Sequence, residues 1–239
     1  MALPFFNNGS RKKLDQILAV DLGSRFTKVV HVQRRGDGLA LCGYAILDAP
    51  ICEKALTAQL LKDHLVLVGQ SFPTKPKHLA LTVSVSDAIV RHVDMPPMPD
   101  EDIRMVLKHN SRSYFQQELS GYLFDFFKTP DTAGSNSEAG KTTGAAKHKM
   151  LIAGAKNEII NEYVTGAREA GFVPDHIVPC VLGPVNAFEN AHPELFASEV
   201  VALVDIGFKS SSISIVKEGE LMLNRVVTIG GDRLTTGLS

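Results

Sequence analysis

The sequence predicts an α/β protein built from two similar half-domains that face each other across a cleft. The main observation is a repeat: residues 19–28 read AVDLGSRFTK, and residues 203–212 read LVDIGFKSSS. Each copy is an apolar run, an Asp-x-Gly turn and a second run rich in β-branched residues, and Asp21 recurs as Asp205. A repeated supersecondary unit indicates a duplicated architecture more strongly than any single motif does.

Composition limits the class of protein. The 239 residues are 44% hydrophobic, so the chain can bury a core in each of two lobes. With 25 Lys and Arg against 26 Asp and Glu, the net charge of −1 indicates no nucleic-acid partner. Cys42, Cys52 and Cys180 lack metal or redox spacing, which favours free thiols in a reducing compartment. No apolar run reaches the length of a membrane span and the start does not read as a signal peptide, so we expect a cytoplasmic protein.

Hydrophobic periodicity predicts the elements of the first-lobe core, residues 1–76. Strands are expected at 16–21, 26–33 and 39–47. A helix is expected at 53–68, because its apolar residues recur at the spacing of one helix face. Two prolines, Pro73 and Pro76, indicate the end of this segment.

An inserted αβ subdomain is expected at 77–175. Its predicted elements are strands at 78–84, 88–94, 121–128 and 149–155, a helix from Pro99 and a helix at 158–170. Gly171 is expected to cap the second helix in the left-handed conformation. The chain should then return to the first lobe at 176–197, with a helix at 183–191, and form the start of the second lobe at 198–239.

The two Asp-x-Gly turns predict a phosphate-binding cleft. Consecutive backbone amides in a tight glycine turn form a concavity for anions. A carboxylate at the end of a buried strand suits Mg²⁺ held through water, so Asp21 and Asp205 are the expected metal ligands. The full set of expected phosphate and metal ligands is Asp21, Gly23, Ser24, Arg25, Phe26, Lys28, Asp205, Gly207, Lys209, Ser210, Ser211, Gly230 and Gly231. No residue can be assigned from the sequence as a catalytic acid or base.

Several segments, in this order, resemble the PilM family, the actin-like proteins of type IV pilus assembly that are related to FtsA. They are 78–84 (HLALTVS), 150–158 (MLIAGAKNE), 201–207 (VALVDIG) and 226–235 (VVTIGGDRLT). The resemblance spans nearly the whole chain and is weakest over 1–6 and 129–148. It implies an actin-like ATPase fold with ribonuclease H-like half-domains and the αβ insert that FtsA and PilM carry.

The resemblance also implies a function. Such a protein is a cytoplasmic scaffold that binds ATP or ADP with Mg²⁺ and associates with itself through its lobes. A groove between the first-lobe core and the 77–175 insert is expected to receive the N-terminal cytoplasmic tail of a PilN-like inner-membrane protein. The scaffold would thus reach the inner membrane through its partner. ATP hydrolysis should be slow or absent, because positioning charges does not by itself activate a water.

Two features of the chain differ from the family pattern. Members of the family continue beyond the position of Ser239, so the second lobe is expected to be incomplete, with 198–239 poorly packed or packed against another copy. Nucleotide binding by the 239-residue chain should then be weak, because the family's adenine pocket lies in that later segment. A small residue commonly follows the second glycine, whereas Phe208 stands here, and its ring is expected to crowd a phosphate.

Two other functions stay open at this point. One is an FtsA-like cell-division scaffold, and the other is a small-molecule kinase of the actin/Hsp70/sugar-kinase superfamily. Kinases of that superfamily lack the αβ insert, so the insert favours an interaction protein.

Overall fold

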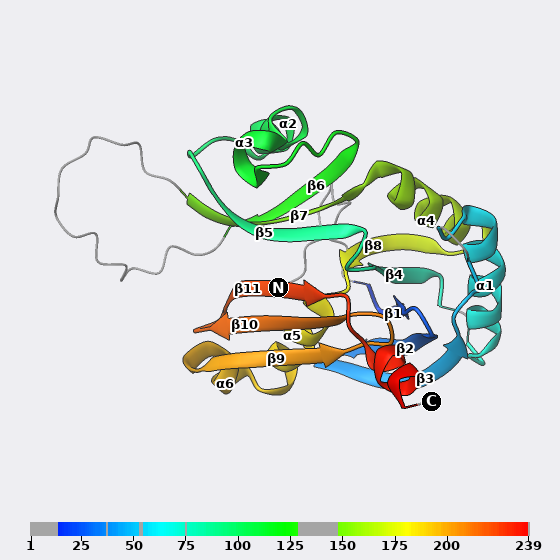
Figure 1. Ribbon diagram of the computed structural model, residues 1–239. Helices are drawn as coiled ribbons and strands as arrows, with labels where there is room; N and C mark the ends of the chain where they lie inside the picture. The colour runs from blue at the N-terminus through cyan, green and yellow to red at the C-terminus, as the bar shows by residue number, and fades with distance from the viewer. Residues whose placement is uncertain (1–13, 37, 53–54, 75, 129–147, 239) are drawn as a thin grey trace, which may run out of the picture.

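The structure is a computed structural model that describes residues 14–36, 38–52, 55–74, 76–128 and 148–238. Its largest element is a five-stranded sheet (Figure 1). The strands lie in the order β3 (Gly38–Asp48), β2 (Phe26–Arg35), β1 (Gln16–Leu22), β4 (His78–Val83) and β8 (Val173–Pro179). The central strand β1 pairs antiparallel with β2 and parallel with β4, and this arrangement brings the β1–β2 turn next to the end of β4.

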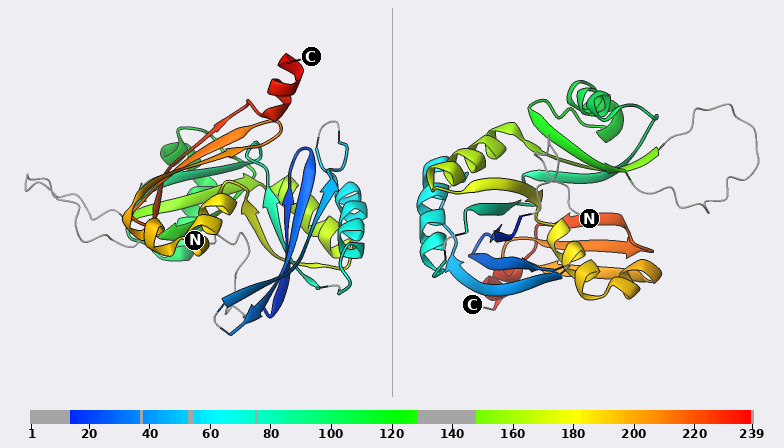
Figure 2. Two further views of the ribbon diagram at one scale, coloured as in Figure 1. Left: turned by 90° about the horizontal axis from the view of Figure 1, so that it is seen from below. Right: turned by 180° about the vertical axis from the view of Figure 1, so that it is seen from behind.

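Two helices pack side by side against this sheet, α1 (Ala58–Gln70) and α4 (Asn157–Glu169) (Figures 1 and 2). Thr57 caps α1, because its Oγ1 accepts the backbone N–H of Leu60 at 3.4 Å. The helices approach closely at Gly166, where an added Cβ would lie 2.6 Å from the carbonyl oxygen of Ala58. As predicted, Gly171 after α4 has a positive φ of 87°.

A second sheet has three strands in the order β5 (Ala88–Met95), β7 (His148–Lys156) and β6 (Tyr122–Lys128). Its central strand β7 is buried on both faces from Met150 to Ala155. On one face, Met150 and Ile152 pack with α2 (Asp100–His109) and α3 (Ser111–Phe115) in a separate core. On the other face, Leu151, Ala153 and Ala155 join the main core of the molecule, so this sheet is fixed to the five-stranded sheet by apolar packing.

The third sheet has the order β11 (Glu220–Val227), β10 (Ser211–Lys217) and β9 (Val200–Ile206). Helices α5 (Leu182–Ala191) and α6 (Pro193–Ser198) precede it, and α7 (Gly231–Gly237) follows it. One face is packed: Val216, Leu221 and Phe196 of α6 are buried in the main core. The opposite face exposes Val204 and Leu223, by 60% and 54%. The poor packing expected at 198–239 is therefore found on one face of this sheet, and the other face is packed.

The sheet pairings argue for narrower bounds of the insert than the expected 77–175. Both β4 and β8 belong to the five-stranded sheet, where they pair with each other along six residues of β4, and α4 packs on α1. We therefore propose that the insert consists of residues 88–156, the segment that forms the second sheet and its helices. No helix in the described ranges is both long and apolar enough to cross a membrane.

Candidate functional site: a cleft between two repeated hairpins

The sequence repeat is also a structural repeat. In the first hairpin Asp21 pairs with Lys28, and in the second Asp205 pairs with Ser212, so both members of the pair keep the offset of 184 residues. Both hairpins are antiparallel, and in each the Asp is the next-to-last residue of the first strand. The two Asp-x-Gly turns are therefore equivalent parts of two similar units, as the sequence predicted.

Each hairpin needs its glycine for the same steric reason. A Cβ on Gly23 would lie 2.5 Å from the carbonyl oxygen of Phe26, and a Cβ on Gly207 would lie 2.7 Å from that of Ser210. The backbone N–H of Gly207 donates to the Ser210 carbonyl at 3.0 Å. This N–H closes the turn, so the amides left to bind an anion in the second hairpin are those after Gly207.

The two carboxylates have different surroundings. The Asp21 Oδ1 accepts a hydrogen bond from Thr82 Oγ1 at 2.9 Å, and Thr82 Oγ1 in turn accepts the Leu22 backbone N–H at 3.1 Å. The Asp21 Oδ2 lies 3.7 Å from Lys28 Nζ. The Asp205 carboxylate is exposed, and within the described part of the chain it makes no hydrogen bond or ion pair. Asp21 is thus held in place by β4 and β2, whereas Asp205 is available to a ligand.

The two hairpins meet across a cavity. Arg25 Cζ lies 5.2 Å from the ring centre of Phe26 and 5.0 Å from that of Phe208 in the other hairpin. Beside this contact is a cavity of about 370 Å³, which Ser24 and Lys209 line from the two sides. The remaining lining residues are Leu22, Gly23, Ala49, Pro50, Ile51, Cys52, Ala55, Leu56, Ser84, Asp87, Ile159 and Tyr163. The structure therefore brings Gly23, Ser24 and Arg25 together with Phe208 and Lys209.

The other expected ligands lie on the hairpins but make internal contacts. Ser211 Oγ donates to the Ile229 carbonyl at 2.6 Å, and the Gly231 N–H donates to the Gly207 carbonyl at 2.9 Å. Gly230 packs against the Phe208 carbonyl, where a Cβ would clash. The start of α7 is therefore docked onto the second hairpin, and the Gly231 amide is not free for a phosphate.

Cys180, which the sequence did not single out for this site, lies close to both carboxylates. Burial, together with the charges of Asp21 and Asp205, raises the pKa of its thiol to about 11 from an ordinary value of 9.0. Its backbone N–H donates to the Val83 carbonyl at 2.9 Å. The charges of both Asp-x-Gly hairpins thus act on this thiol, although neither carboxylate lines the cavity.

This environment predicts that the Cys180 thiol reacts slowly with a disulfide reagent. At pH 8, Cys42 and Cys52, which are exposed, should react with a disulfide reagent such as DTNB at ordinary rates. Cys180 should react about 100-fold more slowly, because a pKa two units higher leaves about 100-fold less thiolate. Stopped-flow absorbance on the native and the urea-unfolded chain measures this. Three fast thiols in the native chain would contradict the placement of Cys180.

Sequence patterns did not identify Thr82, Cys180 or Tyr163 as residues of this site. Thr82 occupies a position that is apolar in most buried strands, and its role depends on β4 pairing with β1. Tyr163 is one of several apolar positions on α4, and burial raises the pKa of its hydroxyl. Among the described residues no group of three or more His, Cys, Asp or Glu is arranged to hold a metal. The carboxylates of Asp21 and Asp205, one from each hairpin, are of the ligand type that fits Mg²⁺, which keeps most of its waters.

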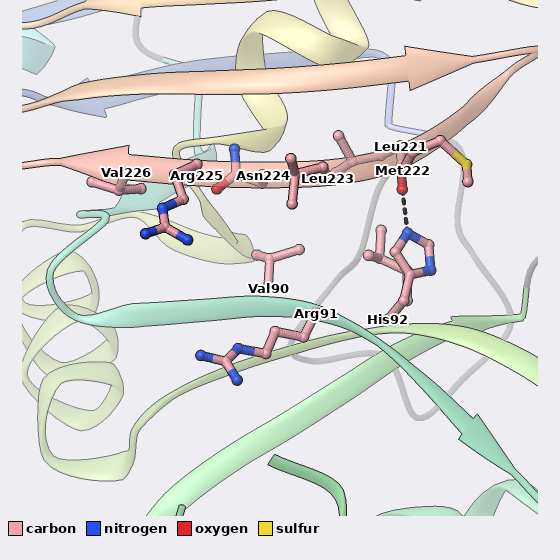
Figure 3. A pocket seen from close by; sticks show the side chains of 10 residues that line it. Val90, Arg91, His92, Leu221, Met222, Leu223, Asn224, Arg225 and Val226 are labelled. Atoms are coloured by element: carbon pink, nitrogen blue, oxygen red, sulfur yellow. Dashed lines mark hydrogen bonds between the residues drawn. The ribbon is translucent and has the colours of Figure 1, made fainter. Parts of the chain in front are cut away.

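A second candidate site is a groove of about 730 Å³ between β5 and β11 (Figure 3). We call it the β5–β11 groove, and its lining is Val90, Arg91, His92, Leu151, Leu221, Met222, Leu223, Asn224, Arg225 and Val226. Both are edge strands among the strands that the structure describes, since β5 pairs there with β7 alone and β11 with β10 alone. The groove expected from the sequence lay between the first-lobe core and the insert, whereas this one lies between the insert and the third sheet.

Polar contacts close one end of this groove. His92 Nε2 donates to the Leu221 carbonyl (Figure 3). Lys149 Nζ lies 3.6 Å from Glu220. Burial lowers the pKa of His92, so the ring is neutral near pH 7. Its Nδ1 is buried without a partner among the described residues. At the other end Arg225 points from β11 toward β5.

Comparisons with known proteins agree with this architecture. A family model described as type IV pilus assembly protein PilM matches residues 19–239. No curated protein sequence matches the chain. A solved PilM–PilN type IV pilus biogenesis complex has a similar chain, with a TM-score of 0.78 and 19% identity over 94% of this chain and 65% of that one.

A second similar structure is the cytoplasmic domain of EpsL, an inner-membrane component of the type II secretion system of Vibrio cholerae. Its TM-score is 0.51 and its identity 11%, over 94% of this chain and 74% of that one. At such identities the likeness shows the fold. The predicted α/β fold of the actin-like class is confirmed. Because the family model covers most of the sequence, the chain belongs to the type IV pilus assembly protein PilM family.

Proposed function

We propose that this chain is an actin-like scaffold of type IV pilus assembly that binds a Mg-nucleotide in the cleft between its two hairpins. We further propose that it receives the N-terminal cytoplasmic tail of an inner-membrane PilN-type protein. The observation that carries the second part is the β5–β11 groove, formed by two open strand edges. Membership of the PilM family and the likeness to a PilM–PilN complex support the choice of partner.

In the nucleotide cleft, Asp21 and Asp205 would hold Mg²⁺, which neutralises phosphate charge when bound. Thr82 keeps the Asp21 carboxylate oriented toward the cleft end of β1. Lys209 and Ser210 lie in the second turn and would donate to phosphate oxygens, and Lys28, which pairs with Asp21 at 3.7 Å, would do so beside the first turn. We propose at most a slow ATPase, because positioning charges does not by itself activate a water.

The groove suits an extended peptide. A strand that enters it can hydrogen bond to the free edges of β5 and β11 and thereby link the second and third sheets. Val90, Leu151 and Val226 supply apolar contacts, and Arg225 supplies a positive charge for a carboxylate of the peptide. The scaffold would then be cytoplasmic and would associate with the inner membrane through this partner.

The direct test is calorimetric titration of the protein with a synthetic PilN-type N-terminal tail peptide. We expect saturable one-to-one binding that does not require nucleotide. A scrambled peptide of the same composition is the control. Equal binding of both peptides, or binding of neither, contradicts the proposed partner.

We also propose self-association through the third sheet. Its outer face exposes Val200, Val204 and Ile206 by 60% or more, and β9 is an open edge. Dimers or larger species are expected by multi-angle light scattering as concentration rises, and Val204→Lys should reduce their size. A wild-type chain that stays monomeric at high concentration would contradict this.

A further inference from the structure

The contact between Arg25 and Phe208 joins the two hairpins of the cleft. Arg25 belongs to the first turn and is exposed, whereas Phe208 belongs to the second turn and is half-buried. The guanidinium lies near two rings, 5.2 Å from Phe26 and 5.0 Å from Phe208. One of these rings comes from its own hairpin and the other from the opposite hairpin, so the side chain spans the cleft.

Within the described ranges Arg25 takes part in a hydrogen bond only through its backbone carbonyl, which accepts the Ala49 N–H at 2.9 Å, so its guanidinium N–H groups have no partner there. Aromatic rings attract a guanidinium through its flat faces, while its N–H groups point outward in the plane. A guanidinium held in this way can donate two parallel hydrogen bonds to a phosphate. Arg25 and Phe208 do not themselves line the adjoining cavity, but their chain neighbours Ser24 and Lys209 do, so polar groups from both hairpins lie beside this contact.

We propose that Arg25 is the principal phosphate-binding side chain of this cleft and that Phe208 positions it from the opposite hairpin. The proposal rests on the proposed nucleotide binding and adds a role for each residue. Phe208 then does not crowd a phosphate, as its size suggested, but holds the cation that contacts it. The ligand class is a Mg²⁺-bound diphosphate or triphosphate, because a single cross-cleft guanidinium can contact phosphates held by either turn.

The test is a double-mutant cycle of Arg25→Ala and Phe208→Ala, measured by calorimetry with Mg-ADP and with Mg-pyrophosphate on the full-length protein. Arg25→Ala should weaken binding of both ligands about tenfold or more. Phe208→Ala should weaken it about threefold in the wild-type background and have no effect in the Arg25→Ala background. Phe208→Tyr should restore binding, because it keeps the ring.

Each contrary outcome overturns a different statement. Tighter binding by Phe208→Ala would mean that the ring obstructs the phosphate. An equal loss from Phe208→Ala in both backgrounds would mean that it does not act through Arg25. Unchanged binding by Arg25→Ala overturns the role of Arg25 alone, whereas no binding by the wild-type protein overturns the proposed nucleotide function as well. Arg34→Ala, an exposed arginine at the far end of β2, is the matched control and should bind as wild type, with circular dichroism confirming that every variant is folded.

Discussion

Replacing Asp205 by alanine is expected to weaken Mg-ADP binding to the full-length protein at least tenfold. The carboxylate is exposed and has no partner in the described part of the chain, so its removal leaves no buried charge behind. The loss should equal that of a contact to a charged group, about 1.5–3 kcal/mol. Calorimetric titration with and without Mg²⁺ measures it, since the variant should lose the effect of Mg²⁺ on ADP binding.

Asp21→Ala should weaken Mg-ADP binding by a similar factor and should also lower the stability of the folded protein. Removal of the carboxylate leaves the Thr82 hydroxyl and Lys28 without their acceptor. Thr82→Val should reproduce part of the binding loss and Thr82→Ser should not, because serine keeps the hydroxyl. Asp63→Ala, on the exposed side of α1, is the control. Unchanged Mg-ADP affinity in both the Asp21 and the Asp205 variants would contradict a metal site shared by the two carboxylates.

Leu223→Asp is expected to weaken binding of a PilN-type tail peptide about tenfold or more. Leu223 is 54% exposed on β11 and lines the β5–β11 groove, so a carboxylate there places an unpaired charge against the peptide without disturbing the core. Arg225→Glu should weaken binding as well if the tail presents a carboxylate. Fluorescence anisotropy with a labelled peptide measures both variants.

The matched control for this experiment is Val200→Asp. It introduces the same charge at an exposed apolar position, 65% accessible, on β9 of the same sheet, away from the groove. Peptide affinity should stay at the wild-type value in Val200→Asp. Equal affinities in Leu223→Asp and Val200→Asp would place the tail elsewhere on the protein.

The hairpins were predictable because their pattern is local. In each, the strand pattern and the Asp-x-Gly turn lie within a short stretch. In the first hairpin the structure reproduces both strands within two residues of their expected ends. The ends of α1 were not predictable in this way. The apolar spacing continues before Thr57, and the helix begins only after this residue caps it.

Strand β8 was missed for a definite reason. It contains Pro174 and Pro179, and prolines argue against a strand in the interior of a sheet. In the structure β8 is the edge of the five-stranded sheet, where a missing N–H is tolerated. Whether a strand lies at an edge depends on pairings between distant residues. The Asp21–Thr82 hydrogen bond and the β5–β11 groove could not be predicted for the same reason, because they depend on partners 61 residues or more away in the chain.

Backbone protection of the two groove strands tests the central claim most directly. Hydrogen–deuterium exchange with mass spectrometry is measured on the protein alone and with saturating PilN-type tail peptide. The account predicts slower exchange in both β5, Ala88–Met95, and β11, Glu220–Val227, because the peptide backbone would occupy their open edges. Unchanged exchange in these two strands, with the peptide bound and another segment protected, would contradict it.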